Sequence, residues 1–146
     1  MCIRDRVYKY RAKISGPLLD RIDIHIELPA AKYQELSSNL PAESSGQIKE
    51  RIYKARLIQR QRLESEGVLY NARMNHRQVR KFCSLAKEES ELLRMAMTEL
   101  NFSARAYDKI LKVSRTIADL AGSGEIKTGH LSEAIQYRSL DRDFFV

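Results

Sequence analysis

The sequence lacks the features that membrane-spanning, secreted and metal-binding proteins share. No apolar run approaches the roughly 20 residues that a membrane-spanning helix needs, and no apolar segment follows the charged start as in a secretory signal. Cys2 and Cys83 are the two cysteines and lie far apart, so we expect both to remain thiols in a reducing cytoplasm. The three histidines are scattered and neither cysteine belongs to a paired motif, so we expect no metal site.

Sequence motifs for catalysis are missing as well. Serine, histidine and aspartate all occur, but nothing resembles the turn that presents a nucleophilic serine. The stretch GSGEIKTG, residues 122–129, is similar to a phosphate-binding loop, yet Ile126 stands where that motif needs a glycine. It also follows a helical pattern rather than a strand, and we interpret it as a connection between two helices.

Positive charge is what the sequence has in excess. Its 26 lysines and arginines outweigh 19 acidic residues and give a net charge of +7, which favours an anionic partner such as nucleic acid, a nucleotide or a membrane surface. The 146 residues allow one domain with a sizeable core, or a small domain with an appendage.

The first structural signal is a strand. Apolar residues alternate with polar ones at period two, which is typical of a half-buried strand, at Ile22, Ile24, Ile26 and Leu28. The Gly16-Pro17 pair marks a turn before it. Arg21 is therefore predicted to stand at the mouth of the strand, between Asp20 and Asp23.

Composition divides the chain into four parts. Residues 1–6 share no periodicity with the rest of the chain and are typical of a translated sequencing adapter, so we expect a non-native prefix and a true chain that begins upstream. Residues 7–30 hold the strand, and residues 31–46, rich in proline and serine, are predicted to be a linker. Residues 47–146 are predicted to form a helical domain.

Five helices are predicted in the C-terminal part. The long first one lies within residues 45–67 and is stopped by Gly67; two more are expected over 77–85 and 88–100. The fourth has the clearest pattern, with Ser103 as N-cap and Gly122 as its stop. The fifth begins after Thr128 and is predicted to bury Leu131, Ala134 and Ile135.

Two arginines are candidates for binding phosphate. Arg21 either forms an ion pair with Asp20 or Asp23 that fixes its loop, or reaches across a subunit boundary to stabilise charge in phosphoryl transfer. Arg105 lies in the first turn of the fourth predicted helix, where free backbone N–H groups attract anions, although the helix dipole opposes a cation there. Arg105 is either a phosphate contact or a solvated arginine. Spacing in the sequence does not decide between the alternatives for Arg21 or for Arg105.

The long first helix carries a basic stripe. Its lysines and arginines could follow a nucleic-acid backbone, or they could form an ordinary solvated helix face, which is the commoner case where few aromatic residues are interleaved. The candidate nucleic-acid contacts are Lys49, Lys54, Arg56 and Arg60.

Two long blocks carry a family resemblance. YRAKISGPLLDRIDIHIELP and NFSARAYDKILKVSRTIADLAGSGEIKTGHLSEAIQYRSLDR closely resemble the C-terminal part of the magnesium-chelatase-like AAA+ ATPases, the ComM/YifB group of bacteria. The resemblance implies a mainly α fold: a helical lid domain preceded by a strand remnant of the α/β ATPase core.

The resemblance also implies roles for the two arginines. Arg21 in LLDRID matches the arginine finger, which acts in trans on ATP held by the next subunit of a ring, expected to be a hexamer. Arg105 in SARAYD matches the sensor-2 arginine, which contacts the γ-phosphate in cis. The ComM-like members resemble DNA helicases that drive branch migration, so DNA is a candidate partner.

The same resemblance predicts what these residues do not supply. The phosphate-binding loop and the acidic Mg²⁺-binding strand would lie upstream, so ATP and Mg²⁺ are expected in the full-length cytoplasmic protein and not on this stretch, which alone should be inactive. Two rival hypotheses are a stand-alone basic helical module that binds DNA or protein, and a chelatase or chaperone-like motor whose substrate is not DNA.

Overall fold

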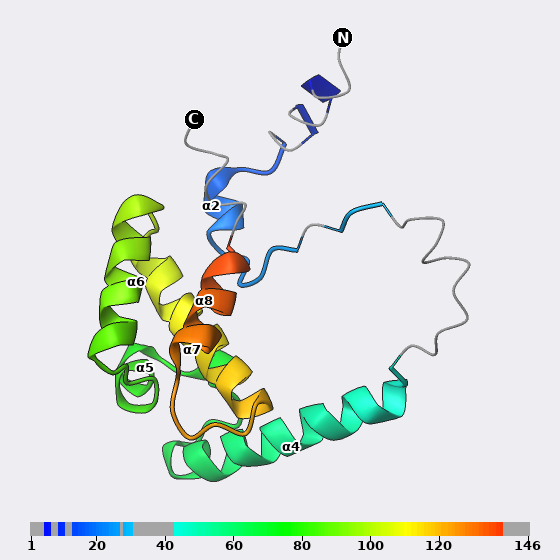
Figure 1. Ribbon diagram of the computed structural model, residues 1–146, viewed down its shortest axis with the longest axis vertical. Helices are drawn as coiled ribbons and strands as arrows, with labels where there is room; N and C mark the ends of the chain where they lie inside the picture. The colour runs from blue at the N-terminus through cyan, green and yellow to red at the C-terminus, as the bar shows by residue number, and fades with distance from the viewer. Residues whose placement is uncertain (1–4, 7–8, 11–12, 27, 31–42, 139–146) are drawn as a thin grey trace.

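The computed structural model describes residues 5–6, 9–10, 13–26, 28–30 and 43–138, and in this part the chain is mainly helical (Figure 1). The long helices are α4 (Ser45–Leu63), α6 (Lys87–Glu99) and α7 (Ala104–Leu120). The shorter ones are α2 (Gly16–Leu19), η1 (Glu64–Glu66), η2 (Asn71–Arg73), α5 (His76–Phe82) and α8 (Thr128–Gln136). The predicted mainly helical fold is confirmed.

Helix α4 begins and ends where its local signals place it. Ser44 accepts a hydrogen bond from the backbone N–H of Gln47, and the Gln47 side chain accepts one from the backbone N–H of Ser44, forming a capping box. The helix tightens into η1 and stops at Gly67, whose φ of 67° lies in the left-handed region. Residues 31–42, which belong to the predicted linker, lie outside the part of the chain that the structure describes.

Helices α5 and α6 differ from their predicted bounds by one to three residues. A capping box of Asn75 and Gln78 starts α5. The helix ends at Phe82, short of the predicted residue 85, because Cys83 adopts φ −117° and ψ 40° outside the helical region. Helix α6 starts and ends one residue before the predicted range of 88–100.

Helix α7 is the central element of the domain and contacts α4, α5, α8 and η2. The predicted cap is confirmed, since Ser103 Oγ accepts a hydrogen bond from the backbone N–H of Ala106 at 3.1 Å. The predicted stop is confirmed as well: Gly122 has φ 67°, and its N–H bonds the carbonyl of Asp119 at 3.1 Å.

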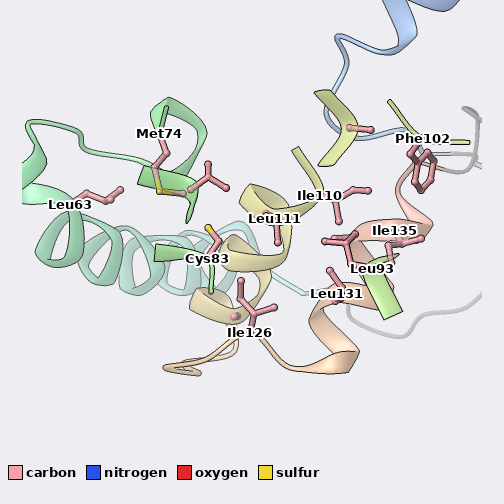
Figure 2. Close-up of a cluster of buried hydrophobic side chains, with 14 residues drawn as sticks. Leu63, Met74, Cys83, Leu93, Phe102, Ile110, Leu111, Ile126, Leu131 and Ile135 are labelled. Atoms are coloured by element: carbon pink, nitrogen blue, oxygen red, sulfur yellow. The ribbon is translucent and has the colours of Figure 1, made fainter. Parts of the chain in front are cut away.

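One hydrophobic core joins the helices (Figure 2). The three residues that the sequence predicted for α8 are all buried, and so is Ile126 in the connection between α7 and α8. This burial fits the interpretation of residues 122–129 as a helix connection. The core consists of Leu63, Met74, Val79, Cys83, Leu93, Phe102, Ala106, Ile110, Leu111, Ala118, Ile126, Leu131, Ala134 and Ile135.

The strand predicted over Ile22–Leu28 is wrong for the residues that the structure describes there. They form an extended segment with no strand, because the described part of the chain offers no second strand for pairing. The segment lies instead on the helical domain, where His25 N–H donates to the carbonyl of Tyr137 at 2.7 Å. Ile24 and Ile26 remain 45% and 65% exposed while His25 is buried.

Candidate functional site

The loop that carries Arg21 is fastened to the first two turns of α7. Lys109 Nζ donates to the backbone carbonyl of Arg21 and forms a salt bridge with Asp23. Ser103 Oγ donates to Asp20 Oδ1 at 2.6 Å, so the hydroxyl that caps α7 also holds the loop. Residues more than 80 positions apart are thereby joined.

A buried arginine just after α8 also fixes this loop. Arg138 is 1% exposed, and its Nη1 donates to the carbonyl of Ile22 at 2.8 Å. Its Nη2 lies 3.8 Å from Asp20 Oδ1. Because the positive charge of a buried arginine needs a nearby counter-charge, Asp20 and Arg138 stabilise each other.

Arg21 is exposed, and its side chain takes no part in these contacts with α7 and Arg138. Its guanidinium Nη1 donates to the carbonyl of Pro17 at 3.2 Å. The ion pair with Asp20 or Asp23, one of the two alternatives drawn from the sequence, is not formed among the described residues. Asp23 pairs with Lys109 of α7, and Asp20 lies near Arg105 of α7 and Arg138, so the Arg21 head group stays accessible.

Arg105 lies next to the loop and is not buried. Its side chain is 67% exposed, and its Nη1 is 3.9 Å from Asp20 Oδ2. The structure thus brings the two predicted phosphate-binding arginines together through one carboxylate, because Asp20 is bonded to Arg21 along the chain and faces Arg105 across space. The cation at the start of α7 is opposed by the helix dipole, and Asp20 offsets that repulsion.

The four candidate nucleic-acid contacts are all exposed on α4. Lys54 forms a salt bridge with Glu50 at 2.8 Å, and its hydrogen bond lowers the pKa of that carboxyl. Arg56 stacks over the Tyr70 ring at 5.4 Å from its centroid. Lys49 and Arg60 form no ion pair within the described part of the chain, and Figure 1 shows the N-terminal part of α4 reaching beyond the bundle.

Sequence reasoning missed the residues that hold the loop. Asp20, Lys109 and Arg138 appear in the sequence as ordinary surface charges, and no spacing marks their contacts. The DR-D pattern of residues 20–23 was a signal that charges gather there, but it does not tell which carboxylate binds which cation.

The described residues contain no group of three metal-ligating side chains. Cys83 is a free, buried thiol. Among the described helices none is both long and apolar enough to cross a membrane.

Two family models match the chain. The one described as magnesium chelatase, subunit ChlI C-terminal, matches residues 42–138. The one described as magnesium chelatase, subunit ChlI, matches residues 1–36. The first of these covers the helical domain almost completely, and the second ends after the loop of Arg21.

Curated relatives match over nearly the whole chain. Competence protein ComM of Haemophilus influenzae is 39% identical over 94% of this chain and 26% of its own length. Uncharacterized protein YifB of Escherichia coli is 37% identical over 97% of this chain and 27% of its own length. YifB of Salmonella typhimurium is 35% identical over the same shares. The chain therefore spans about a quarter of the length of these relatives.

Proposed function

The chain belongs to the magnesium-chelatase-like (ChlI C-terminal) family of AAA+ proteins, and from this premise we propose that it is the lid-side part of a ring-forming cytoplasmic ATPase. Arg21 is the arginine finger, acting on ATP bound by the next subunit. Arg105 is the sensor-2 arginine, acting on ATP bound by its own subunit. The observation that carries the proposal is that the exposed Arg21 loop is fastened to the very turn of α7 that presents Arg105.

Arg21 has the properties that a finger needs. Its guanidinium is exposed and neutralised by no carboxylate in the described residues, while Lys109 holds the carbonyl of Arg21 itself and Arg138 holds that of the following Ile22. An arginine so presented adds positive charge where negative charge develops on the transferring phosphate, with little loss of freedom on binding.

Arg105 suits a contact with phosphate in its own subunit. It stands in the first turn of a 17-residue helix, whose N-terminus already favours an anion. Its exposure leaves the guanidinium free to turn toward a ligand. ATP and Mg²⁺ would be held by a phosphate-binding loop and acidic side chains, which we expect in the part of the relatives that extends beyond this chain.

The test is to replace Arg21 by alanine in the full-length protein. We expect ATP hydrolysis to be lost and ATP binding to remain near the wild-type level, because a finger acts on charge that develops during transfer. Arg94→Ala on α6 is the matched control, since Arg94 is an exposed arginine paired with Glu91. Wild-type turnover by the Arg21 variant would contradict the assignment.

We further propose that the remodelled substrate is DNA and that the motor acts as a helicase or branch-migration enzyme. The name of the Haemophilus relative, a competence protein, supports this, and so do the exposed lysines and arginines of α4. The rival hypotheses are a non-DNA motor, such as a chelatase or chaperone-like machine, and a basic module that binds DNA or protein without ATP. DNA-stimulated ATP hydrolysis by the full-length protein would favour a motor that acts on DNA over both rival hypotheses.

A further inference from the structure

We propose that Asp20 is a positioning residue that couples the two nucleotide sites of a subunit. It holds Arg105 when no phosphate is near and loses that partner when phosphate arrives, so the neighbouring Arg21 responds to the occupancy of its own subunit's site. The inference rests on the proposed function, because it needs Arg105 to act in cis and Arg21 in trans.

The two oxygens of the Asp20 carboxylate have separate partners. Oδ1 accepts the hydrogen bond of Ser103 Oγ at 2.6 Å and lies 3.8 Å from Arg138 Nη2, both of which anchor the loop. Oδ2 faces Arg105 Nη1 at 3.9 Å. One carboxylate therefore fixes the loop with one oxygen and senses Arg105 with the other.

The contact with Arg105 is the one that a ligand can displace. Arg105 is 67% exposed, and at 3.9 Å the two groups form a solvent-screened ion pair of the weak kind. A polyphosphate carries more charge than a carboxylate and offers several acceptor oxygens, so it competes well for a guanidinium. The anchoring contacts differ, since Arg138 is buried and the Ser103 bond is short.

Displacement at Oδ2 acts on Arg21 through a single peptide bond. Lys109 and Arg138 hold the carbonyls of Arg21 and Ile22, so the loop stays on the helices. What changes is the electrostatic pull of Arg105 on Asp20, the residue directly before Arg21. Coupling of this kind is reciprocal: if phosphate at one site repositions the finger for the next site, the finger's engagement also changes phosphate affinity.

Asp20→Asn removes the charge that faces Arg105 and keeps the hydrogen bonds that anchor the loop. The amide oxygen of asparagine still accepts the Ser103 hydrogen bond, and Arg138 still donates to the carbonyl of Ile22, while the negative charge shared by Arg105 and Arg138 is gone. In the full-length protein we expect this variant to bind ATP several-fold more tightly, because Arg105 no longer has a competing carboxylate. We also expect the Hill coefficient of ATP hydrolysis to fall toward one, because the sites no longer communicate.

The gain in affinity is the informative result, since a merely structural role would only weaken binding. Glu88→Gln is the matched control, because it removes an equal charge from an exposed position on α6, and it should change neither quantity. The gain should disappear in the Asp20→Asn, Arg105→Ala double variant. Asp20→Glu, which keeps the charge, should retain cooperative hydrolysis and serves if the asparagine variant fails to fold.

The outcomes separate this inference from the function on which it rests. An Asp20→Asn variant with wild-type affinity and cooperativity, or with weakened ATP binding, overturns the coupling role of Asp20. Loss of cooperativity in the Asp20→Glu variant overturns it as well. If Arg21→Ala and Arg105→Ala both hydrolyse ATP like the wild type, the proposed function itself fails, whatever Asp20 does.

Discussion

Arg62 in the last turn of α4 forms a salt bridge with the fully buried carboxylate of Asp119 in the last turn of α7. Asp119 also accepts hydrogen bonds from Arg115 Nε at 3.1 Å and from Asn71 Nδ2 at 2.8 Å. The basic helix and the helix of Arg105 are thus joined at their C-terminal ends.

The Asp119 cluster makes a strong prediction about stability. Asp119→Asn leaves the buried Arg115 without its counter-charge, so we expect the free energy of unfolding to fall by about 3–5 kcal/mol. Urea unfolding of this chain, followed by circular dichroism, measures it. The control is Glu91→Gln, which breaks the exposed Glu91–Arg94 pair and should cost under about 1 kcal/mol. Equal losses in the two variants would show that the cluster adds nothing beyond a surface pair.

The end of α7 offers a test of backbone conformation alone. A Cβ added at Gly122 meets no atom within 4 Å, but its φ of +67° is strained for an L residue. Gly122→Ala should therefore lower the free energy of unfolding by about 1–2 kcal/mol. Gly124→Ala, which also meets no atom and has no positive φ, is the matched control and should cost much less. A destabilised Gly124 variant with a neutral Gly122 variant would contradict the explanation.

Burial makes Cys83 a probe of unfolding. Desolvation raises the pKa of its thiol from an ordinary 9.0 to about 11. The folded state holds this proton more tightly than the unfolded state does. The contribution of the protonated thiol to the free energy of unfolding is therefore complete below pH 9.0 and is lost as the pH rises toward 11. We expect the free energy of unfolding to decline over that range in the Cys2→Ser variant, and to decline less when Cys83→Ala is added. Alkylation of Cys83 near about pH 8 should also require opening of the core; rapid alkylation of the folded chain would disprove its burial.

The basic helix makes a prediction in DNA binding. If Lys49 and Arg60 bind phosphates, replacing both with glutamine should reduce the slope of log affinity against log salt by about 0.9 for each phosphate no longer neutralised. A filter-binding titration of this chain with duplex DNA at several salt concentrations measures the slope. Lys87→Gln with Arg94→Gln on α6 removes equal charge and should leave the slope nearly unchanged. Equal slopes in the two double variants would mean that α4 makes no specific contribution.

Local chemistry explains which features were predictable from the sequence. Helix α7 starts at the side chain of Ser103 and stops at the left-handed backbone of Gly122, and each acts on groups only a few residues away. For that reason the start and the stop were both predicted correctly. The strand was not, because a period-two pattern specifies a strand only when another strand is available for pairing. In the described residues the segment meets α7 and α8 instead.

The contacts around Asp20 could not have been predicted from spacing. They join Asp20 to Ser103 across 83 positions and Ile22 to Arg138 across 116. No periodicity relates residues so far apart, and a buried arginine such as Arg138 has the same sequence signature as a solvated one. The roles of Arg21 and Arg105 stay predictions for the same reason: a contact with ATP is not a property of either residue alone.

The most direct test of the central claim is complementation between two inactive variants of the full-length protein, Arg21→Ala and Arg105→Ala. If Arg21 acts in trans and Arg105 in cis, a site held by an Arg21→Ala subunit beside an Arg105→Ala subunit contains both arginines. Random mixed rings should then have about one complete site in four, and ATP hydrolysis should reappear on mixing. If both arginines serve one site from the same subunit, no mixture contains a complete site. Hydrolysis that stays absent in demonstrably mixed rings would contradict the account.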